Sequence, residues 1–280
     1  MPEQRSLAQA FERAGFAALS DLSADGYAGL FTELEGVQAE FLAQVAAFRD
    51  PGYHWGEDTL HTWARAWEYP YAAYHVARER ERVAGPFVVA DFGSGSTYFP
   101  FAVARYGARV ICLDNDPVCV RDLQAAAGVV AAGSGHVEVR LSADVLPVPS
   151  ASVDLAYSVS VLEHMPDPVP VVSEIARIVR PGGLLVLTMD IDVEGAAGVA
   201  VAHFEALRRD LATFFTWEFP DRTIHPQDTL TSRTSPWPRP GERYVPGLLL
   251  RTRDRRLVPL IGGPNPGVLS VYACVLRRRS

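Results

Sequence analysis

A glycine-containing segment at residues 88–97, VVADFGSGST, constrains the fold of this chain more than any other feature. Its first half is apolar enough to form a buried strand, and the glycines that follow are typical of a tight turn that opens a helix. A second apolar segment, residues 110–113, ends in Asp114. Such glycines let a ligand approach the backbone closely, and an acidic residue after the next strand can bind ribose hydroxyls. The pattern therefore predicts a site for a nucleoside-containing cofactor.

The sequence around this turn alternates between strand and helix patterns as far as about residue 190. Apolar segments predict strands at residues 87–92, 110–114, 137–141, 153–159 and 184–189, with helices between them at residues 97–106, 117–131 and 169–179. Strands that alternate with helices form mainly parallel sheets covered on both faces. The predicted fold class is therefore α/β, with a doubly wound, mainly parallel sheet of the Rossmann-like type.

The regions that flank this pattern differ from it. Residues 1–85 contain no segment that predicts a strand, and we expect a helical N-terminal cap or lid there, with helices at residues 7–19, 29–48 and 59–82 and a break near Pro70. Residues 86–280 are expected to form the cofactor-binding domain, with an irregular insertion at about residues 219–246. In its last third we expect a helix at residues 199–215, short strands at 248–250 and 257–261, and a final strand at 268–276.

Composition narrows the function classes. The formal net charge is −7, which argues against nucleic acid as the main partner because phosphate binding needs a basic surface. All 26 positively charged residues are arginines, so mechanisms that need a lysine nucleophile are excluded. The three cysteines form no CxxC pair and no even framework, which favours a reduced, cytoplasmic setting. No apolar segment approaches membrane-spanning length, and no Asp, Glu and His set has metal-ligand spacing.

The identity of the nucleoside cofactor depends on the residues after the glycines. A dinucleotide site requires Gly-x-Gly-x-x-Gly or Ala, because the last small residue lets the helix pack closely on the strand. Here that last position is Tyr98, which argues against a dinucleotide. The alternative pattern, acidic-x-Gly-x-Gly, is complete in Asp91, Gly93 and Gly95.

This second pattern resembles the first motif of the class I S-adenosylmethionine (SAM) methyltransferases. The resemblance continues through residues 147–155 (PVPSASVDL), 158–165 (SVSVLEHM) and 174–183 (EIARIVRPGG), in the order in which the family has them. It extends over residues 87 to about 190 and is closest to the small-molecule branch called methyltransferase type 11. It implies SAM as the cofactor and a small molecule as the methyl acceptor, with neither nucleic acid nor membrane as a partner.

The resemblance also implies a set of cofactor-binding residues. The backbone around Gly93, Ser94 and Gly95 would hold the methionine end, together with Ser158, while Asp91 orients the turn. Asp114 would accept hydrogen bonds from the ribose hydroxyls, with Asn115 beside it, and Ser142, Ala143 and Asp144 would surround the adenine. Two interpretations without a ligand remain open. The glycines can form a plain tight turn, and Asp114 can cap the helix that begins near Pro117.

Two positions depart from the family pattern. The family usually has a third glycine where this chain has Thr97, a residue that can cap the following helix. The register of the adenine contact is also open. An ungapped alignment places Ser142 at the family's acidic position, whereas a two-residue deletion places Asp144 there; we favour Asp144 because a carboxylate accepts well from an amino group.

The catalytic candidates follow the predicted strands. Methyl transfer needs an acceptor held in line with the methyl group, and a hydroxyl acceptor also needs a base. His164 is the first candidate for that base, because in this family the loop after the fourth strand opens onto the substrate side. The alternative is a histidine that only stabilises this loop by hydrogen bonds, since the sequence Leu-Glu-His is common in the family irrespective of the acceptor. Asp190 follows the strand predicted at residues 184–189, and His225 lies in the irregular insertion.

Aromatic residues are concentrated between residues 53 and 74. Trp63 and Trp67 have helical spacing and are expected in the core. Trp55 and Tyr71 are the expected contacts to the acceptor, since aromatic faces bind cations and flat organic groups.

The sequence therefore predicts a SAM-dependent methyltransferase that acts on a small molecule, with O-methylation slightly favoured and a place in bacterial specialised metabolism. Two alternatives remain: a SAM-fold enzyme that catalyses a cyclisation or decarboxylation, and a SAM-binding regulatory protein without catalysis. The sequence does not distinguish a monomer from a homodimer.

Overall fold

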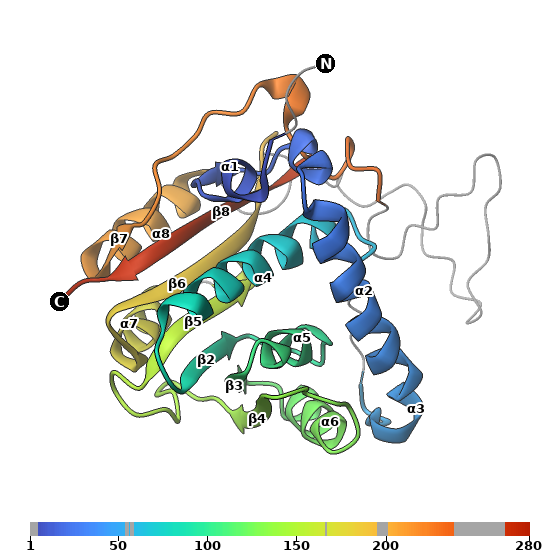
Figure 1. The fold of residues 1–280 in the computed structure, drawn as a ribbon. Coiled ribbons are helices and arrows are strands. Elements are labelled where there is room, and N and C mark those ends of the chain that lie inside the picture. The colour runs from blue at the N-terminus through green and yellow to red at the C-terminus, as the bar shows by residue number, and fades with distance from the viewer. Residues whose placement is uncertain (1–4, 54–55, 57–58, 166, 195–200, 238–266) are drawn as a thin grey trace.

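The computed structural model describes residues 5–53, 56, 59–165, 167–194, 201–237 and 267–280. In these residues a mixed sheet lies at the centre of the molecule, with helices on both faces (Figure 1). The strands are β1 (Gly15–Phe16), β2 (Phe87–Phe92), β3 (Ala108–Asp114), β4 (His136–Leu141), β5 (Val153–Val159), β6 (Val179–Asp192), β7 (Phe215–Trp217) and β8 (Leu269–Arg278). The helices are α1 (Leu7–Phe11), α2 (Tyr27–Ala43), α3 (Val45–Phe48), α4 (Arg65–Arg82), α5 (Phe99–Arg105), α6 (Pro117–Ala127), α7 (Val169–Ile178) and α8 (Val201–Phe214).

The order of the strands across the sheet is β1-β8-β6-β5-β2-β3-β4, and β7 pairs with β8 beside this path. The strands from β6 to β4 are parallel to one another, whereas β8 runs antiparallel to β6. The predicted α/β class with a mainly parallel sheet is confirmed, with an antiparallel edge. Strand β2 lies between β3 and β5, so the strand order reverses at β2: strands β3 and β4 follow on one side of it, and β5 and β6 on the other. In open parallel sheets, ligands bind at the carboxyl ends of the strands where the order reverses in this way.

Helices α4, α5 and α6 pack on one face of the sheet, and α7 and α8 pack on the other. Helix α2 lies outside α4 and α5 (Figure 1). Because side chains alternate along a strand, Leu155 and Tyr157 of β5 belong to the first core and Ala156 to the second. Both faces of the central strands are therefore buried, which explains why they are apolar throughout.

Helix α4 continues through Pro70, where the sequence predicted a break. That prediction is wrong, and the reason is local. Proline has no amide hydrogen, so the Ala66 carbonyl has no partner four residues further along the helix. The Tyr27 hydroxyl of α2 donates to this carbonyl at 2.6 Å instead. A tertiary contact thus replaces the missing helical hydrogen bond and holds α4 against α2.

The N-terminal region also contains a strand, which the sequence did not predict. Helix α1 ends at Phe11, well before residue 19, and β1 pairs antiparallel with β8 through Gly15 and Phe16. Two residues are too few to show the alternation by which strands are recognised. Residues 15 and 16 therefore belong to the same sheet as the rest of the chain. The expected division into a cap of residues 1–85 and a cofactor-binding domain stays a prediction.

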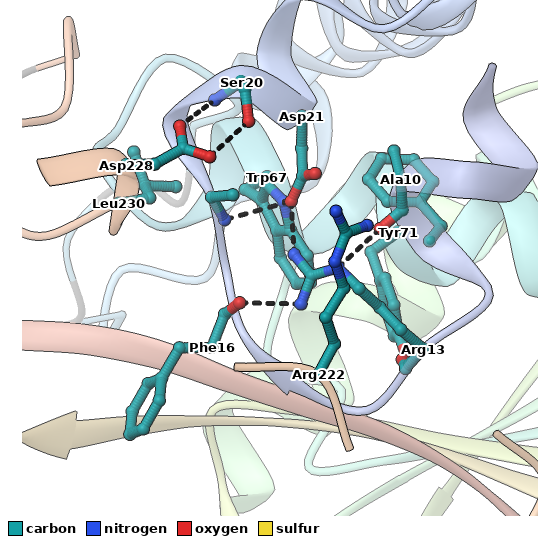
Figure 2. A network of polar contacts seen from close by, with 12 residues as sticks. Ala10, Arg13, Phe16, Ser20, Asp21, Trp67, Tyr71, Arg222, Asp228 and Leu230 are labelled. Atoms are coloured by element: carbon teal, nitrogen blue, oxygen red, sulfur yellow. Dashed lines mark hydrogen bonds and ion pairs between the residues drawn. The ribbon is translucent and has the colours of Figure 1, made fainter. Parts of the chain in front are cut away.

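A buried polar network joins this N-terminal segment to α4 (Figure 2). Asp21 is fully buried, and its Oδ2 accepts from Arg13 Nη2 at 2.5 Å and from Trp67 Nε1 at 2.9 Å. The same Arg13 guanidinium donates to the carbonyl of Phe16 at 2.7 Å. The Tyr71 hydroxyl donates to the Arg13 carbonyl at 3.2 Å. These contacts fix α4 relative to β1 and therefore relative to the sheet.

The remaining predictions of strands in residues 86–280 fare unevenly. The strands expected at residues 87–92 and 153–159 coincide with β2 and β5, and the final strand is confirmed as β8. The strands expected at 248–250 and 257–261 lie outside the described residues. None of the helices that the structure describes has the length and apolarity needed to cross a membrane.

Candidate functional site

The glycine turn lies at the carboxyl end of β2, at the point where the strand order reverses. Gly93 and Gly95 have φ values of 74° and 54°, a left-handed conformation that favours glycine. The Gly93 amide donates to the Leu113 carbonyl of β3 at 2.8 Å. The turn is therefore held against the end of β3, and the buried Asp91 lies in β2, two residues before Gly93.

Asp114 ends β3 beside this turn. Its Oδ2 accepts from the Gly95 amide at 2.7 Å, and its Oδ1 accepts from the Asp116 amide at 2.8 Å. Burial raises the pKa of this carboxyl group, although both backbone hydrogen bonds oppose the effect. Each oxygen retains acceptor capacity beyond its one amide. The structure thus brings the predicted ribose acid and the predicted glycine turn together, with Asn115 exposed beside them.

The predicted adenine residues follow β4. The Ser142 amide donates to the Asp114 carbonyl at 2.7 Å, which places Ser142 directly next to the end of β3. Ala143 and Asp144 continue from there and are exposed. By position, Ser142 is therefore closer to Asp114 than the preferred Asp144 is, and the register of the adenine contact stays a prediction.

Two serine hydroxyls at the predicted methionine end are candidates for contacts with a polar ligand. The Oγ atoms of Ser94, in the turn, and Ser158, in β5, are buried and have no hydrogen-bond partner among the described residues. Buried hydroxyls are normally satisfied, so a partner from outside the protein chain fits these positions. A Cβ built at Gly95 would meet only the Thr97 methyl group, at 3.7 Å. The departure at Thr97 therefore leaves the space beside Gly95 open.

Acidic residues lie at the ends of β5 and β6, where an acceptor would approach. Glu163 is buried, and its Oε1 accepts from the Asp190 amide at 2.8 Å, while its Oε2 has no hydrogen-bond partner among the described residues. Burial, together with the neighbouring Asp190 carboxylate, raises the pKa of Glu163 well above its usual value. Such a carboxyl group can retain a proton near neutral pH.

His164 follows Glu163 in the same short 3₁₀ helix, η2 (Leu162–His164), and is exposed. Partial desolvation of its ring and the nearby Arg65 guanidinium lower its pKa. At neutral pH the ring is therefore uncharged and able to accept a proton, but it is a weaker base than an ordinary histidine. The structure brings two predicted catalytic residues, His164 and Asp190, to the same end of the sheet through Glu163.

A buried glutamate from α4 completes this end of the sheet, and the sequence did not predict it. Glu68 is fully buried, and its Oε1 accepts from Ser160 Oγ at 2.6 Å and from Thr188 Oγ1 at 2.7 Å. Its Oε2 forms an ion pair with Arg65. In the sequence, Arg65 and Glu68 have the spacing of a surface helix pair, so their pattern carries no sign of burial.

Three other predicted residues are placed differently. His225 is exposed and caps the 3₁₀ helix η3 (Pro226–Asp228), from which Asp228 accepts a hydrogen bond from Ser20. Its segment is therefore attached to the N-terminal region, and no described contact joins it to His164 or Asp190. Tyr71 is fully buried and stacks on Trp67 with 4.7 Å between ring centroids, the position of a core residue. Trp55 lies outside the described residues.

A separate cavity of about 460 Å³ opens between β1, α8 and the ends of β6 and β8. Aromatic rings of Phe16, Phe204 and Tyr272 form one wall, and Arg208 lies within 6 Å of two of them. None of the predicted site residues lines this cavity. Within the described residues, His, Cys, Asp and Glu side chains form no group of three suited to a metal ion.

Comparison with known proteins places this geometry in context. Residues 90–187 match the family described as the methyltransferase domain. An uncharacterized methyltransferase of Mycobacterium leprae (strain Br4923) is 38% identical over 104 residues, which is 37% of each chain. Another, from Mycobacterium avium (strain 104), is 41% identical over 101 residues, 36% of this chain and 38% of that relative. The chain therefore matches little more than a third of the length of these curated relatives.

Solved structures give a more distant similarity. The cyclase SpnF covers 65% of this chain and 70% of its own, with a TM-score of 0.46 and 24% identity. A SAM-dependent methyltransferase from Aquifex aeolicus covers 83% of this chain and 97% of its own, with the same TM-score of 0.46 and 12% identity. Scores of this size support no inference about a reaction.

Proposed function

We propose that this chain, whose residues 90–187 belong to the class I SAM-dependent methyltransferases, transfers a methyl group from SAM to a small-molecule acceptor. SAM is the cofactor of that family. The observation that carries the proposal is the position of Asp114. Its carboxylate lies beside the glycine turn, bonded to the Gly95 amide, at the carboxyl ends of two adjacent parallel strands.

The residues at this end of the sheet fit the chemical groups of SAM. Asp114 would accept hydrogen bonds from the ribose hydroxyls, and Ser142 would lie beside the adenine. The buried hydroxyls of Ser94 and Ser158 suit the polar methionine end. We propose that residues 1–85 cover this site as a cap.

SAM supplies, when bound, a methyl group on a positively charged sulfur. The contribution of the chain is to orient the acceptor and to exclude water, which accounts for much of the rate in such displacements. A hydroxyl acceptor must also lose a proton. His164 is uncharged and exposed after β5, and the buried Glu163 precedes it in the chain. These groups support O-methylation slightly over N- or C-methylation, although an amine or thiolate acceptor needs no base.

Charge supports a small molecule as the acceptor. The formal net charge of −7 is unfavourable for the phosphate contacts that dominate nucleic-acid binding. Specialised metabolism remains our proposal for the setting, on the family resemblance.

Isothermal titration calorimetry with SAM and with its demethylated product tests the proposal. We expect the full chain to bind both, and Asp114→Ala to weaken SAM binding about ten- to a hundredfold, the usual effect of lost hydrogen bonds to a charged group. Asp25→Ala, a change at an exposed carboxylate, is the control and should bind as the wild type does. No binding at millimolar SAM would refute the proposal.

A second set of variants addresses the register and the reaction. If Asp144 contacts the adenine, Asp144→Ala weakens SAM binding and Ser142→Ala does not; the reverse result assigns the contact to Ser142. SAM binding without methyl transfer to a broad panel of hydroxyl, amine and thiol acceptors would favour a cyclisation or decarboxylation, or a regulatory protein that binds SAM.

A further inference from the structure

A series of contacts that begins at Glu68 leads from α4 to the glycine turn. Helix α4 packs against β5 and β6 (Figure 1). Glu68 lies on the face of α4 that makes this contact, because it bonds to Ser160 after β5 and to Thr188 in β6. One of its carboxylate oxygens accepts from two hydroxyls, Ser160 Oγ at 2.6 Å and Thr188 Oγ1 at 2.7 Å. A buried carboxylate without hydrogen-bond partners is strongly destabilising, so loss of these contacts would cost free energy.

Ser160 has an unusual backbone conformation, which the contacts with Glu68 help to maintain. It follows the last residue of β5 and has a φ of 52°, a left-handed conformation that is uncommon outside glycine. Its amide donates to the Thr188 carbonyl at 3.1 Å, which holds the backbone, and Glu68 holds the side chain. Strained backbone of this kind persists only where surrounding contacts enforce it.

The residue after Ser160 contacts the cofactor turn directly. The Val161 side chain packs so closely on Gly93 that a Cβ added at Gly93 would lie 2.5 Å from Val161 Cγ2. The position of Val161 is fixed by the turn at Ser160, because the two residues share a peptide bond. A continuous path of contacts therefore runs from Glu68 through Ser160 and Val161 to Gly93.

From this path we infer that Glu68 is a positioning residue for SAM binding: it holds the turn at Ser160 in the conformation that sets Val161 against the glycine turn. The inference rests on the proposed function, because it concerns the affinity for SAM. It adds to that function a residue that lies outside the segment matched to the methyltransferase domain, residues 90–187. The N-terminal region is then part of the cofactor site and not only its cover.

Glu68 acts here through geometry and not as a base. Two hydroxyl donors and the Arg65 guanidinium occupy its two carboxylate oxygens. The carboxylate therefore acts by holding these partners in place. Its removal should therefore change the affinity for SAM before it changes any proton transfer.

Calorimetric titration of SAM into the purified full chain and its variants tests the inference. We expect Glu68→Gln and Ser160→Ala each to weaken SAM binding about tenfold. Glu68→Gln replaces the charged acceptor by a neutral one and places an amide NH2 group against Arg65, whereas Ser160→Ala removes the hydroxyl donor itself. Glu79→Gln changes another buried glutamate near the opposite end of the same helix, and serves as the control for general damage to α4. It should stay within about twofold of the wild type, the usual limit of independence between distant sites.

A glycine substitution separates positioning from simple packing. Ser160→Gly removes the hydroxyl but accepts the left-handed conformation without strain. We therefore expect Ser160→Gly to bind SAM more tightly than Ser160→Ala, and Glu68→Gln to have little further effect in the Ser160→Gly background. Melting temperatures of all variants show whether each one is folded.

The outcomes are distinct. The inference is supported if Glu68→Gln weakens SAM binding about tenfold in the wild type and has little further effect in the Ser160→Gly background. A wild-type affinity for Glu68→Gln, an equal loss in Glu79→Gln, or an undiminished Glu68→Gln effect in the Ser160→Gly background would overturn the inference while leaving SAM binding intact. Absence of SAM binding by the wild type would instead refute the proposed function on which the inference rests.

Discussion

The cofactor end of the sheet and the N-terminal region are held together by different kinds of contact. At the cofactor end, backbone amides make the bonds: Gly93 donates to Leu113, Gly95 to Asp114, and Ser142 to the Asp114 carbonyl. In the N-terminal region, buried side chains make them, with the Asp21 carboxylate at the centre (Figure 2).

This difference predicts how each region fails. A backbone amide survives almost any substitution, so the cofactor end is sensitive mainly to changes that alter backbone conformation or remove the one carboxylate. A buried ion pair is sensitive to the loss of either partner, because the remaining charge is left without compensation. Loss of a buried charge in the Asp21 network should therefore lower mainly the stability, whereas changes at the glycine turn and at Asp114 should also lower the affinity for SAM.

The largest expected effect is on the Asp21 network. Asp21→Ala leaves the buried Arg13 guanidinium and the Trp67 indole without their acceptor, and we expect a loss of about 3–5 kcal/mol in the free energy of unfolding. Urea titration followed by circular dichroism measures it. Asp228→Ala removes a partly exposed carboxylate from the same region, where we expect a loss of only about 1 kcal/mol. Equal losses of stability in the two variants would show that the burial of the carboxylate does not determine its contribution.

The next effect tests backbone conformation at the cofactor end. Gly93→Ala places a methyl group 2.5 Å from Val161 Cγ2, in addition to the strain of a φ of 74°. Gly182→Ala has the same kind of strain, at a φ of 76°, but no neighbouring atom within 4 Å. We expect Gly182→Ala to cost about 1 kcal/mol in stability and Gly93→Ala about 3 kcal/mol, with weaker SAM binding only for Gly93→Ala.

Relief of the contact sharpens this comparison. Val161→Ala in the Gly93→Ala background removes the two methyl groups that collide, and should restore part of the stability. If the double variant is as unstable as Gly93→Ala alone, the loss comes from backbone strain and not from the contact with Val161.

A pH effect of intermediate size is expected from the N-terminal region. His75 is buried, its Nε2 lies 3.1 Å from the Phe11 carbonyl oxygen, and its pKa is lowered by burial from 6.5 to about 3. Since that carbonyl only accepts, the neutral ring is the donor. The unfolded chain takes up a proton below pH 6.5 and the folded chain does not, so stability falls as the pH falls. Between pH 7 and 5 we expect His75 to account for a loss of about 2 kcal/mol.

Urea titrations of His75→Gln and the wild type at several pH values check this effect. The variant should be less stable at pH 7 because it fills the site less well, but its stability should fall less steeply toward pH 5. His136→Gln, at an exposed histidine, should retain the wild-type slope. A variant of His75 with an unchanged slope would assign the acid sensitivity to other groups.

The two regions also differ in how far the sequence predicted them. Strands β2 and β5 and the pairing of Asp114 with the glycine turn follow from patterns within a short stretch, because their contacts are local or lie between consecutive strands. Strand β1 pairs with β8 at the other end of the chain, and two residues carry no periodicity. The prediction failed where the deciding contact was distant.

Single residues show the same limit. Pro70 is a helix breaker by its chemistry, and only the hydroxyl of Tyr27, from another helix, makes it acceptable. Glu68 has the spacing of a surface salt bridge with Arg65, and only the packing of α4 on β5 and β6 buries it. Tyr71 was expected to contact an acceptor, and its stacking on Trp67 in the core follows from the same packing.

The smallest expected effect lies between the two regions, at Glu163. Its pKa is raised in the folded chain by burial and by Asp190, so the folded state holds a proton that the unfolded state releases above about pH 4.5. Stability should therefore fall as the pH rises from 4.5 toward the raised pKa, the opposite direction to His75. Glu163→Gln keeps an oxygen for the Asp190 amide and does not titrate. We expect its melting temperature to rise relative to the wild type as the pH increases, by about 2–4 °C for each kcal/mol, and differential scanning calorimetry measures this. If the difference in melting temperature between Glu163→Gln and the wild type is constant from pH 5 to 8, Glu163 is already ionised in the folded chain at pH 5.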